Sequence, residues 1–432
     1  MRVYLEHYKT TIELTDEQER LVEKAVNAFR SGEQLFQYAA PAGCGKSVVL
    51  HVIINQLGYD EDQIAPMAYM GSAAMVMRKN GFKNAKTCHS WLFNPIMDPY
   101  VDPLSGKTKY KIKFIPLPLN REEIKLIVID EASMVPIELR RVIEANHIPV
   151  LVCGDLDQLQ PVASRSAYLT TGKVERLTKI MRQSAQSSII TISNLLRNNL
   201  RPSPGDYGDV LVIPYECLTN DMLLQAEAII CGYNSTRDDI TKYVRSLIGF
   251  RGPLPYYGER VVCRKNNWDE TIDGISLVNG MIGTCVSRDN SISKMKSEET
   301  FSMDFQPLLF PEITFTDLNC DYEYFIANHS KRQEIKQYEM SHRTYITKNK
   351  FEFGYAITTH MSQGNQYKHG IYIEQPFGDR KLQSNLNYTG ITRFMDHCIY
   401  VLPGRKRVSM PPLQRSMKIK KCVLMTDGQF QM

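Results

Sequence analysis

The sequence predicts an α/β protein with parallel sheets, because short apolar strands alternate with helical patterns along its first third. Four strands are expected there, at Leu35–Tyr38, Ala65–Met70, Lys125–Ile129 and Pro149–Cys153. Helical patterns follow Lys46, Gly71 and Pro136. Because a helix between two strands carries the chain back to the same edge, this alternation is typical of a parallel sheet.

A glycine-rich segment joins the first strand to the first helix. Residues 40–47 read A-P-A-G-C-G-K-S, a phosphate-binding loop of the G-x-x-x-x-G-K-[ST] type in which alanine replaces the first glycine. Such a loop turns tightly and presents backbone N–H groups, so glycine is needed where a side chain would block the phosphates. We expect Lys46 to reach the β- and γ-phosphates of a nucleotide and Ser47 to bind Mg²⁺. The alternative is an ordinary glycine turn.

Cys44 lies between two glycines of this loop, at the expected start of the helix. Because the positive end of a helix dipole stabilises a thiolate, we expect a lowered thiol pKa and high reactivity at this position.

Composition limits the class of protein. A chain of 432 residues suggests two to four domains, and 43% hydrophobic with 23% charged residues is typical of a soluble globular protein. No apolar stretch approaches the roughly 20 residues of a membrane span, and the first residues lack a signal-peptide pattern, so we expect a cytoplasmic location. Ten scattered cysteines favour reduced thiols over disulfides or a zinc site. The net charge of +5 permits a polyanionic partner.

Two interruptions break the α/β pattern. Residues 93–121 contain five prolines around the turn signal Leu104-Ser105-Gly106, which predicts an inserted hairpin. Residues 289–349 hold short β-rich runs and a charged segment. Alternation resumes from about Leu177, with later strands expected at Ala228–Cys231, Arg260–Arg264, Phe353–Thr358 and Gly370–Glu374.

Two acids end the third strand, where Ile127-Val128-Ile129 runs into Asp130-Glu131. Successive side chains at a strand end point in different directions, so Asp130 can orient Mg²⁺ while Glu131 faces the attacking water. The alternative is a pair of caps for a helix that starts at Ala132. The next strand ends at Gly154-Asp155, and Gln158 follows in the crevice where α/β sheets bind ligands, so its amide is placed to sense the γ-phosphate.

The order of these motifs resembles superfamily 1 DNA helicases of the RecD/Dda branch, and the compact length is similar to the phage Dda type. The resemblance rests first on Gly43–Ser47, Asp130–Ser133 and the G-D-x-x-Q-L-x-P-V run at 154–162. Further matching segments extend it from about residue 14 to 401: Leu14–Gln18, Thr87–Ser90, Leu177–Arg182, Val278–Gly280, Thr359–Gly364 and Tyr388–Arg393.

The resemblance implies two RecA-like core domains with ATP bound between them. The first would span residues 1–154, with the hairpin at 93–121 as domain 1B and its strand-separating pin. The second would span residues 155–432, with a β-barrel-like domain 2B at 289–349. ATP and Mg²⁺ are the implied cofactors.

It also implies roles for individual residues. Glu131 would be the general base, Lys46 and Gln158 would act on the γ-phosphate, and Arg182 and Arg393 would be arginine fingers. Mg²⁺ would be held by Ser47 and Asp130. The residues expected to line the ATP site are Gln18, Pro41, Ala42, Gly43, Cys44, Gly45, Lys46, Ser47 and Gly364. Those expected to contact nucleic acid are Tyr69, Thr87, His89, Asn279, Thr359, His360 and Gln363. For the two histidines, the alternative is a hydrogen-bonded interior position.

Three positions depart from the pattern of the family. Met70 stands where threonine is usual, Met361 where lysine is usual, and Phe394 where a small residue is usual. We expect altered nucleic-acid contacts and an intact ATPase.

The second strand of the expected hairpin alternates lysines with apolar or aromatic residues. Its cationic face would carry Lys107, Lys109, Lys111 and Lys113 and could follow a phosphate backbone. The alternative is an edge strand that lysines keep soluble. The candidate aromatic residues at the pin are Tyr100, Tyr110 and Phe114, since stacking on a base returns about 1–3 kcal/mol. The basic segment at 405–421 is either a solvated tail or a further phosphate-binding arm.

The primary interpretation is an ATP-dependent DNA helicase that moves 5′→3′ on single-stranded DNA and unwinds duplexes in replication, recombination or repair. Its expected partners are single-stranded DNA, junctions of single-stranded and duplex DNA, and replication or recombination proteins. We expect no association with a membrane. Its location would be the host cytoplasm if a phage encodes it. Two alternatives are an RNA helicase of the same superfamily and an ATP-switched loading or remodelling factor.

Overall fold

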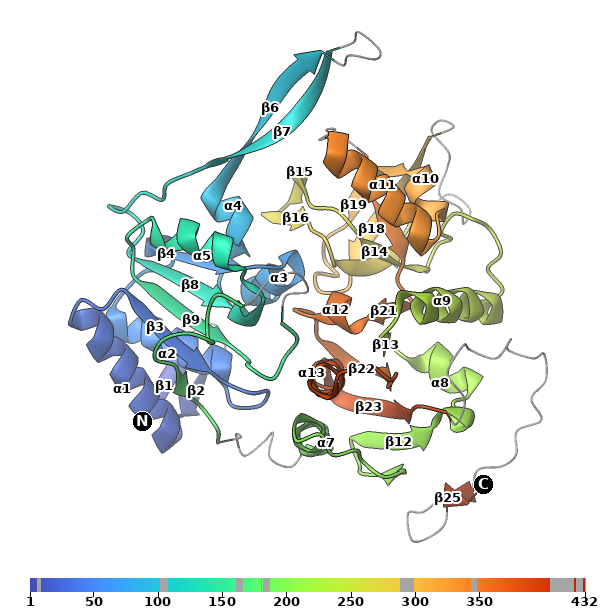
Figure 1. The fold of residues 1–432 in the computed structure, drawn as a ribbon, viewed down its shortest axis with the longest axis horizontal. Coiled ribbons are helices and arrows are strands. Elements are labelled where there is room, and N and C mark those ends of the chain that lie inside the picture. Colours follow the sequence, from blue (N-terminus) through green and yellow to red (C-terminus); the bar gives the residue numbers. More distant parts are fainter. Residues whose placement is uncertain are drawn as a thin grey trace.

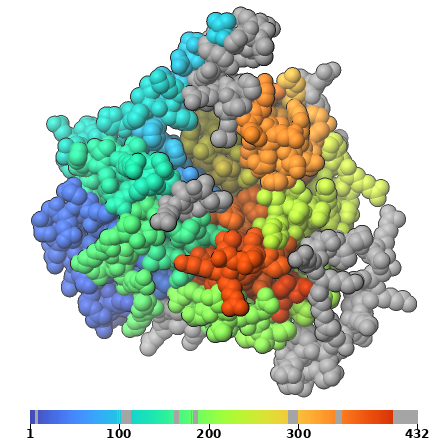
Figure 2. Space-filling view, viewed as in Figure 1, coloured from blue at the N-terminus to red at the C-terminus, as the bar shows by residue number. Residues whose placement is uncertain are grey.

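A computed structural model describes residues 1–5, 9–101, 108–160, 166–179, 181, 187–287, 299–342, 348–404, 423–424 and 430–431. Two α/β core domains lie side by side, and each carries an insertion at the same end of the molecule (Figure 1). Figure 2 shows the first core domain in blue to green beside the second core domain, whose last elements are orange and red.

The first core domain is built on a six-stranded sheet in which every pair is parallel. Its strand order is β10 (Glu175–Arg176), β3 (Leu35–Ala39), β9 (Val150–Gly154), β8 (Leu126–Asp130), β4 (Ile64–Ala68) and β5 (Lys86–Thr87). Its helices are α1 (Asp16–Arg30), α2 (Lys46–Leu57), α3 (Gly71–Lys79), α4 (Cys88–Leu92) and α5 (Ile137–Glu144), with short 3₁₀ turns η1 (Glu61–Gln63) and η2 (Ala132–Met134). The hairpin of β1 (Arg2–Leu5) and β2 (Thr10–Glu13) precedes α1.

Helices cover both faces of this sheet, so its strands are apolar on both sides. Leu126 and Val128 of β8 pack into the core formed with α1 and α2. Ile127 and Ile129, one position along, pack into the opposite core with α4 and α5. Side chains of a strand alternate between its two faces, so the apolar residues of β8 fill both cores in turn. For this reason β8 does not alternate between apolar and polar residues.

The first sheet reaches beyond the boundary expected at residue 154. β10 pairs with β3, with Glu175 opposite Tyr38 and Arg176 opposite Ala39. This short strand adds to the free edge of β3. The expected division between residues 154 and 155 is therefore corrected: residues up to Arg176 belong to the first sheet.

The inserted hairpin is present as expected and projects beyond the core domains above α4 (Figure 1). Its strands β6 (Phe93–Val101) and β7 (Thr108–Pro116) pair antiparallel in continuous register, from Phe93 opposite Pro116 to Val101 opposite Thr108. The prolines of β6 are tolerated because a two-stranded ribbon leaves one edge of each strand without a ladder partner. The turn signal at 104–106 lies outside the described residues.

The second core domain has the order β11 (Gly205–Asp206), β12 (Val210–Pro214), β23 (Phe394–Leu402), β22 (Tyr367–Ile373), β13 (Ala228–Cys231) and β21 (Ala356–Thr358). All its pairs are parallel except that of β11 with β12. Its helical elements are α7 (Ser188–Arg197), η3 (Tyr215–Cys217), α8 (Asn220–Gln225), α9 (Asn234–Ile248), α12 (Thr359–Ser362) and α13 (Arg380–Ile391). The short strands β24 (Val423–Leu424) and β25 (Phe430–Gln431) pair with each other.

The second insertion is larger than expected. Its antiparallel sheet has the order β19 (Phe315–Asp321), β18 (Thr300–Pro307), β17 (Ile282–Cys285), β14 (Arg260–Cys263) and β20 (Phe351–Phe353). It also holds the hairpin of β15 (Asn267–Ile272) and β16 (Ile275–Leu277), and helices α10 (Tyr322–Ile326) and α11 (His329–His342). The expected strand near Arg260 forms, but it pairs with β17 and β20 and so belongs to this sheet. The insertion expected at 289–349 is corrected to about 260–353.

A buried cluster of charges joins this insertion to the second core domain. Glu352 of β20 contacts Arg237 of α9 at 3.1 Å, Arg264 at 3.1 Å and Arg332 of α11 at 3.4 Å. Burial alone would raise the pKa of Glu352, but these arginines lower it to about 2. We call these four residues the Glu352 cluster.

None of the helices in the described ranges is long and apolar enough to cross a membrane.

Candidate functional site

The phosphate-binding loop lies where β3 ends and α2 begins. Gly43 has a φ of 83° and Gly45 a φ of 75°, a left-handed conformation that glycine adopts without strain. A Cβ atom added at Gly45 would lie 2.6 Å from Nε2 of Gln18. Backbone geometry therefore favours glycine at both positions, and close packing on Gln18 adds a second reason at Gly45.

Lys46 lies between the two acids that end β8. Its Nζ is 2.8 Å from Oδ1 of Asp130 and 3.2 Å from Oε1 of Glu131. Burial would lower the pKa of Lys46, but the two carboxylates raise it well above its ordinary value. Burial would likewise raise the pKa of Asp130, and Lys46 lowers it. The structure brings these three residues together at one edge of the sheet, and their roles toward ATP and Mg²⁺ stay predictions.

The backbone turns sharply after Asp130. Glu131 has a φ of 51°, which is uncommon for a residue with a side chain, and its N–H donates to Oδ1 of Asp130 at 2.7 Å. The two acids therefore do not simply alternate along a strand. Glu131 contributes to a small cavity of about 10 Å³, room for one water-sized molecule.

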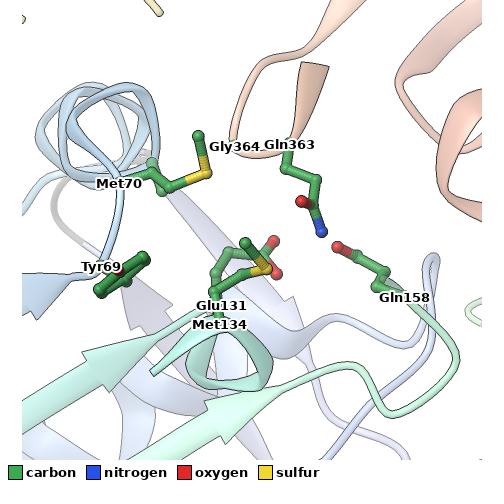
Figure 3. A pocket seen from close by; sticks show the side chains of 8 residues that line it. Tyr69, Met70, Glu131, Met134, Gln158, Gln363 and Gly364 are labelled. Atoms are coloured by element: carbon green, nitrogen blue, oxygen red, sulfur yellow. The ribbon is translucent and has the colours of Figure 1, made fainter. Parts of the chain in front are cut away.

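Both core domains line this cavity. Its other lining residues are Tyr69, Met70, Ala73, Met134, Gln158, Gln363 and Gly364 (Figure 3). The side chains of Gln158 and Gln363 point toward one another, with Glu131 below them. Oε1 of Gln363 is buried without a hydrogen-bond partner. A buried acceptor beside an acid in a water-sized cavity is suited to orienting a polar group there.

Gln158 lines the same cavity as Glu131, and its action on the γ-phosphate stays a prediction. Three contacts tie its segment to the second core domain. Nδ2 of Asn385 donates to the carbonyl of Gln158 at 3.3 Å, and Nε2 of Gln363 donates to that of Leu159 at 3.2 Å. The N–H of Leu159 donates to Oγ1 of Thr389 at 3.1 Å. The loop after β9 thus connects the edge of the first sheet with α12 and α13.

Tyr388 is a site residue that our sequence analysis missed. Its hydroxyl donates to Oδ2 of Asp155 at 2.6 Å and accepts from the N–H of Ala42, in the phosphate-binding loop, at 3.1 Å. Tyr388 belongs to the matching segment 388–393, from which only Arg393 was singled out. The available signal was therefore its place in that segment.

Gln18 lies at the start of α1, beside the phosphate-binding loop. Its Oε1 accepts the N–H of Thr15 at 3.0 Å and its N–H donates to Oγ1 of Thr15, which closes a capping box at the start of α1. Its Nε2 donates to the carbonyl of Cys44 at 2.9 Å. Gln18 therefore supports the phosphate-binding loop, and its contact with ATP stays a prediction.

The expectation for Cys44 was wrong. Burial, with smaller effects from Glu17 and Asp155, raises the pKa of its thiol to about 11. The side chain is completely buried in the core that α1 and α2 share, so it does not present its sulfur at the start of α2. Loss of hydration outweighs the helix dipole.

The two expected arginine fingers have different outcomes. Arg182 lies outside the described residues. Arg393 is buried, and its Nε donates to the carbonyl of Thr389, in the last turn of α13, at 3.2 Å. In this arrangement Arg393 caps the end of α13, and its role as a finger stays a prediction.

The residues expected to bind nucleic acid separate into two groups. Tyr69 and His89 are 6.0 Å apart between ring centroids, and His89 stacks on Phe93 at 5.7 Å, so an aromatic row leads to the base of the hairpin. Asn279 is exposed and its N–H donates to Oδ1 of Asn266. His360 is half-buried, and burial lowers its pKa.

The other three are held internally. Thr87 caps α4 by accepting from the N–H of Ser90, and Oγ1 of Thr359 donates to the carbonyl of Cys231 at 3.3 Å. Gln363 is buried in the cavity beside Glu131. Gly364, expected at ATP, lines the same cavity and packs so closely on α3 that a Cβ would lie 2.7 Å from the nitrogen of Ala73.

On the hairpin, Lys113 is exposed and the Phe114 side chain is 58% exposed. The pairing puts positions 109, 111 and 113 of β7 on one face and 110, 112 and 114 on the other. The side chains of Tyr100, Lys109, Tyr110 and Lys111 lie outside the described set, as does all of Lys107.

Comparison with known proteins places the site in context. Residues 13–206 match a family model described as an AAA domain. The ATP-dependent DNA helicase RRM3 of Saccharomyces cerevisiae is 30% identical over 215 residues, which are 43% of this chain and 27% of that protein. The chain thus spans about a quarter of the length of this relative.

Solved structures resemble the whole fold. The Pif1 helicase of Candida albicans aligns with 90% of this chain and 94% of its own, at 17% identity and a TM-score of 0.51. A Bacteroides Pif1 bound to single-stranded DNA aligns with 90% and 92%, at 16% identity and a TM-score of 0.53. The chain therefore has the two-domain RecA-like helicase fold.

Proposed function

We propose that this chain is an ATP-dependent DNA helicase that moves along single-stranded DNA in the 5′→3′ direction and unwinds duplexes. The observation that carries the proposal is that Lys46 contacts Asp130 and Glu131, and that Glu131 lines a cavity completed by the second core domain. A hydrolytic site closed by a second domain can couple chemistry to domain motion. The direction of movement is supported by the resemblance of residues 154–162 and Thr359–Gly364 to the RecD/Dda branch. The cytoplasmic location stays a prediction.

Three residues would act directly on the triphosphate. Lys46, held here by two carboxylates, would instead form ion pairs with the β- and γ-phosphates through its ammonium group. Ser47 and Asp130 would hold Mg²⁺, for which hydroxyl and carboxylate oxygens are suitable donors, and the ion would supply charge neutralisation at the phosphates. Among the described residues, no group of three or more acids, histidines or cysteines is arranged to hold a metal ion.

Glu131 would take the proton of the attacking water. Its carboxylate lies in a cavity with room for about one water molecule, and Gln158 and Gln363 are placed to orient that molecule. Arg182 and Arg393 would add positive charge from the second domain when the cleft closes, as the family resemblance implies.

DNA would bind over the first core domain and reach the hairpin. The aromatic row Tyr69, His89 and Phe93 ends at the first residue of β6, so bases that stack there would lead to the base of the hairpin. The exposed Phe114 and Lys113 on β7 fit a pin that meets bases on one face and phosphates on the other.

The pin is tested by shortening the hairpin between Val101 and Thr108 to a two-residue turn. ATPase activity stimulated by single-stranded DNA should persist, because translocation requires no melting, while unwinding of a tailed duplex should fall at least tenfold. Phe114→Ala tests the aromatic face, and Leu224→Ala, which removes an exposed apolar residue of α8 in the second core domain, is the matched control. Unwinding at the wild-type rate by the shortened variant would exclude the pin.

The electrostatic face is tested by changing Lys107, Lys109, Lys111 and Lys113 to glutamine. Each lost phosphate contact should reduce the slope of log affinity against log salt by about 0.7 for single strands. An unchanged slope would leave the lysines the role of solubilising an edge strand.

A further inference from the structure

Tyr388 connects two segments of the first core domain although it belongs to the second. Its hydroxyl bonds Oδ2 of Asp155 at 2.6 Å and the N–H of Ala42 at 3.1 Å. The side chains of Tyr388 and Asp155 are almost completely buried. One hydroxyl therefore links the phosphate-binding loop to the loop after β9, across the boundary between domains.

The spacing of residues on α13 explains how this contact is made. Asn385, Tyr388 and Thr389 are three and four positions apart, so they share one face of the helix. Asn385 bonds the carbonyl of Gln158 and Thr389 bonds the N–H of Leu159. This face of α13 thus covers the segment from Asp155 to Leu159 while Tyr388 reaches past it to Ala42.

The contact depends on the relative position of the core domains. Both partners of the hydroxyl lie in the first core domain, so withdrawal of α13 breaks both bonds together. The hydroxyl also has both its functions engaged, since it donates to a carboxylate and accepts from an amide.

Charge supports the same conclusion. Burial raises the pKa of Asp155 to about 6, and the bond from Tyr388 opposes that rise. Asp157 and Glu131 are the acids that face Asp155, and the N–H of Asp157 donates to its other oxygen at 3.0 Å. The hydrogen bond from Tyr388 therefore helps the carboxylate of Asp155 to stay ionised beside the phosphate-binding loop.

We propose that Tyr388 is a positioning residue for ATP hydrolysis, which fixes the phosphate-binding loop at Ala42 and the Asp155–Leu159 segment in their catalytic arrangement only when the two core domains are closed. This inference rests on the proposed ATPase function. Tyr388 acts through Ala42 and Asp155 and through the adjoining Gln158, and it performs no chemistry itself.

The test is Tyr388→Phe, which removes only the hydroxyl oxygen. The DNA-stimulated kcat should fall at least tenfold, while KM for ATP changes less than threefold, because closure is affected more than nucleotide binding. Tyr372→Phe is the matched control: its hydroxyl is also buried and bonds Oδ1 of Asn387 at 2.9 Å, within the second core domain. Equal losses in both variants would reduce Tyr388 to a structural residue.

Two Asp155 variants extend the test. Asp155→Asn keeps an oxygen that accepts from Tyr388 and should retain more activity than Asp155→Ala. The double variant Tyr388→Phe with Asp155→Ala should be no slower than the worse single variant, since both changes break one network. Additive losses would contradict the linkage.

A readout without turnover separates this inference from the proposed function. Amide hydrogen exchange at residues 155–160 should be at least tenfold faster in Tyr388→Phe than in Tyr372→Phe, because that segment loses its cover when α13 withdraws. Equal exchange would overturn the inference even in an active enzyme. A wild-type chain without DNA-stimulated ATPase would refute the proposed function and leave the exchange comparison to decide the role of Tyr388.

Discussion

Changing Glu131 to glutamine should separate ATP binding from hydrolysis. Glutamine preserves the size of the side chain but cannot take a proton from water. A positioned general base contributes about 10²- to 10⁴-fold to a reaction, so kcat should fall by at least 10²-fold. The phosphate-binding loop and Lys46 remain intact, so the variant should still bind ATP.

The structure also predicts the direction in which affinity changes. Oε1 of Glu131 is 3.2 Å from Nζ of Lys46, and the two side chains are 20% and 17% exposed. A charge-assisted contact with this degree of burial is worth about 1–2 kcal/mol, and ATP must displace it to reach Lys46. Its removal, together with one negative charge near the triphosphate, should tighten ATP binding by about 5- to 30-fold.

The assay pairs steady-state phosphate release on single-stranded DNA with equilibrium titration of a fluorescent ATP analogue. Glu138→Gln, which removes one negative charge from an exposed position on α5, is the control and should match the wild type in both measurements. Hydrolysis above a tenth of the wild-type rate in Glu131→Gln would place the base elsewhere. Weaker ATP binding would show that Glu131 does not compete for Lys46.

Three further predictions concern other residues. Arg393→Ala should lower kcat by about 10³-fold if Arg393 acts as a finger, whereas a change in KM alone would make it a binding residue. Cys44 should resist alkylation in the folded protein and react only after unfolding, as mass spectrometry would show; rapid labelling would contradict its burial. The pKa of Glu352 is lowered from 4.5 to about 2, so its ionised form stabilises the fold above pH 4.5. This contribution is on the order of 3 kcal/mol and is lost as the pH falls toward 2. The free energy of unfolding of Glu352→Gln should therefore fall less steeply over that window, and a slope equal to that of the wild type would refute the role of the Glu352 cluster.

Sequence patterns predicted the elements whose signals are local. The alternation of strands and helices placed β3, β4, β8 and β9, and the glycine spacing located the phosphate-binding loop, because turn geometry and apolar periodicity depend on neighbouring residues. The turn and proline signals located the β6–β7 hairpin for the same reason.

Features that depend on distant pairing were not predictable in this way. β10 contains two residues, too few for a periodic pattern, and it exists because the edge of β3 is available. β14 has the apolar pattern of a core strand, so only its partners β17 and β20 assign it to the insertion.

The site shows the same division. Lys46, Asp130 and Glu131 follow from motifs, because each motif fixes a side chain at the end of a strand or the start of a helix. The orientation of Cys44 into the core and the reach of Tyr388 across the cleft depend on packing between segments. The place of Tyr388 in a matching segment marked it as a candidate, but residue type and spacing did not show which residues it contacts.

The central claim is tested most directly by unwinding of tailed DNA duplexes. With ATP, the protein should separate a duplex with a 5′ single-stranded tail, leave a matched duplex with a 3′ tail intact, and show no unwinding as the Glu131→Gln variant. Preference for the 3′ tail would contradict the assigned direction. ATP hydrolysis without separation of either duplex would contradict the helicase assignment.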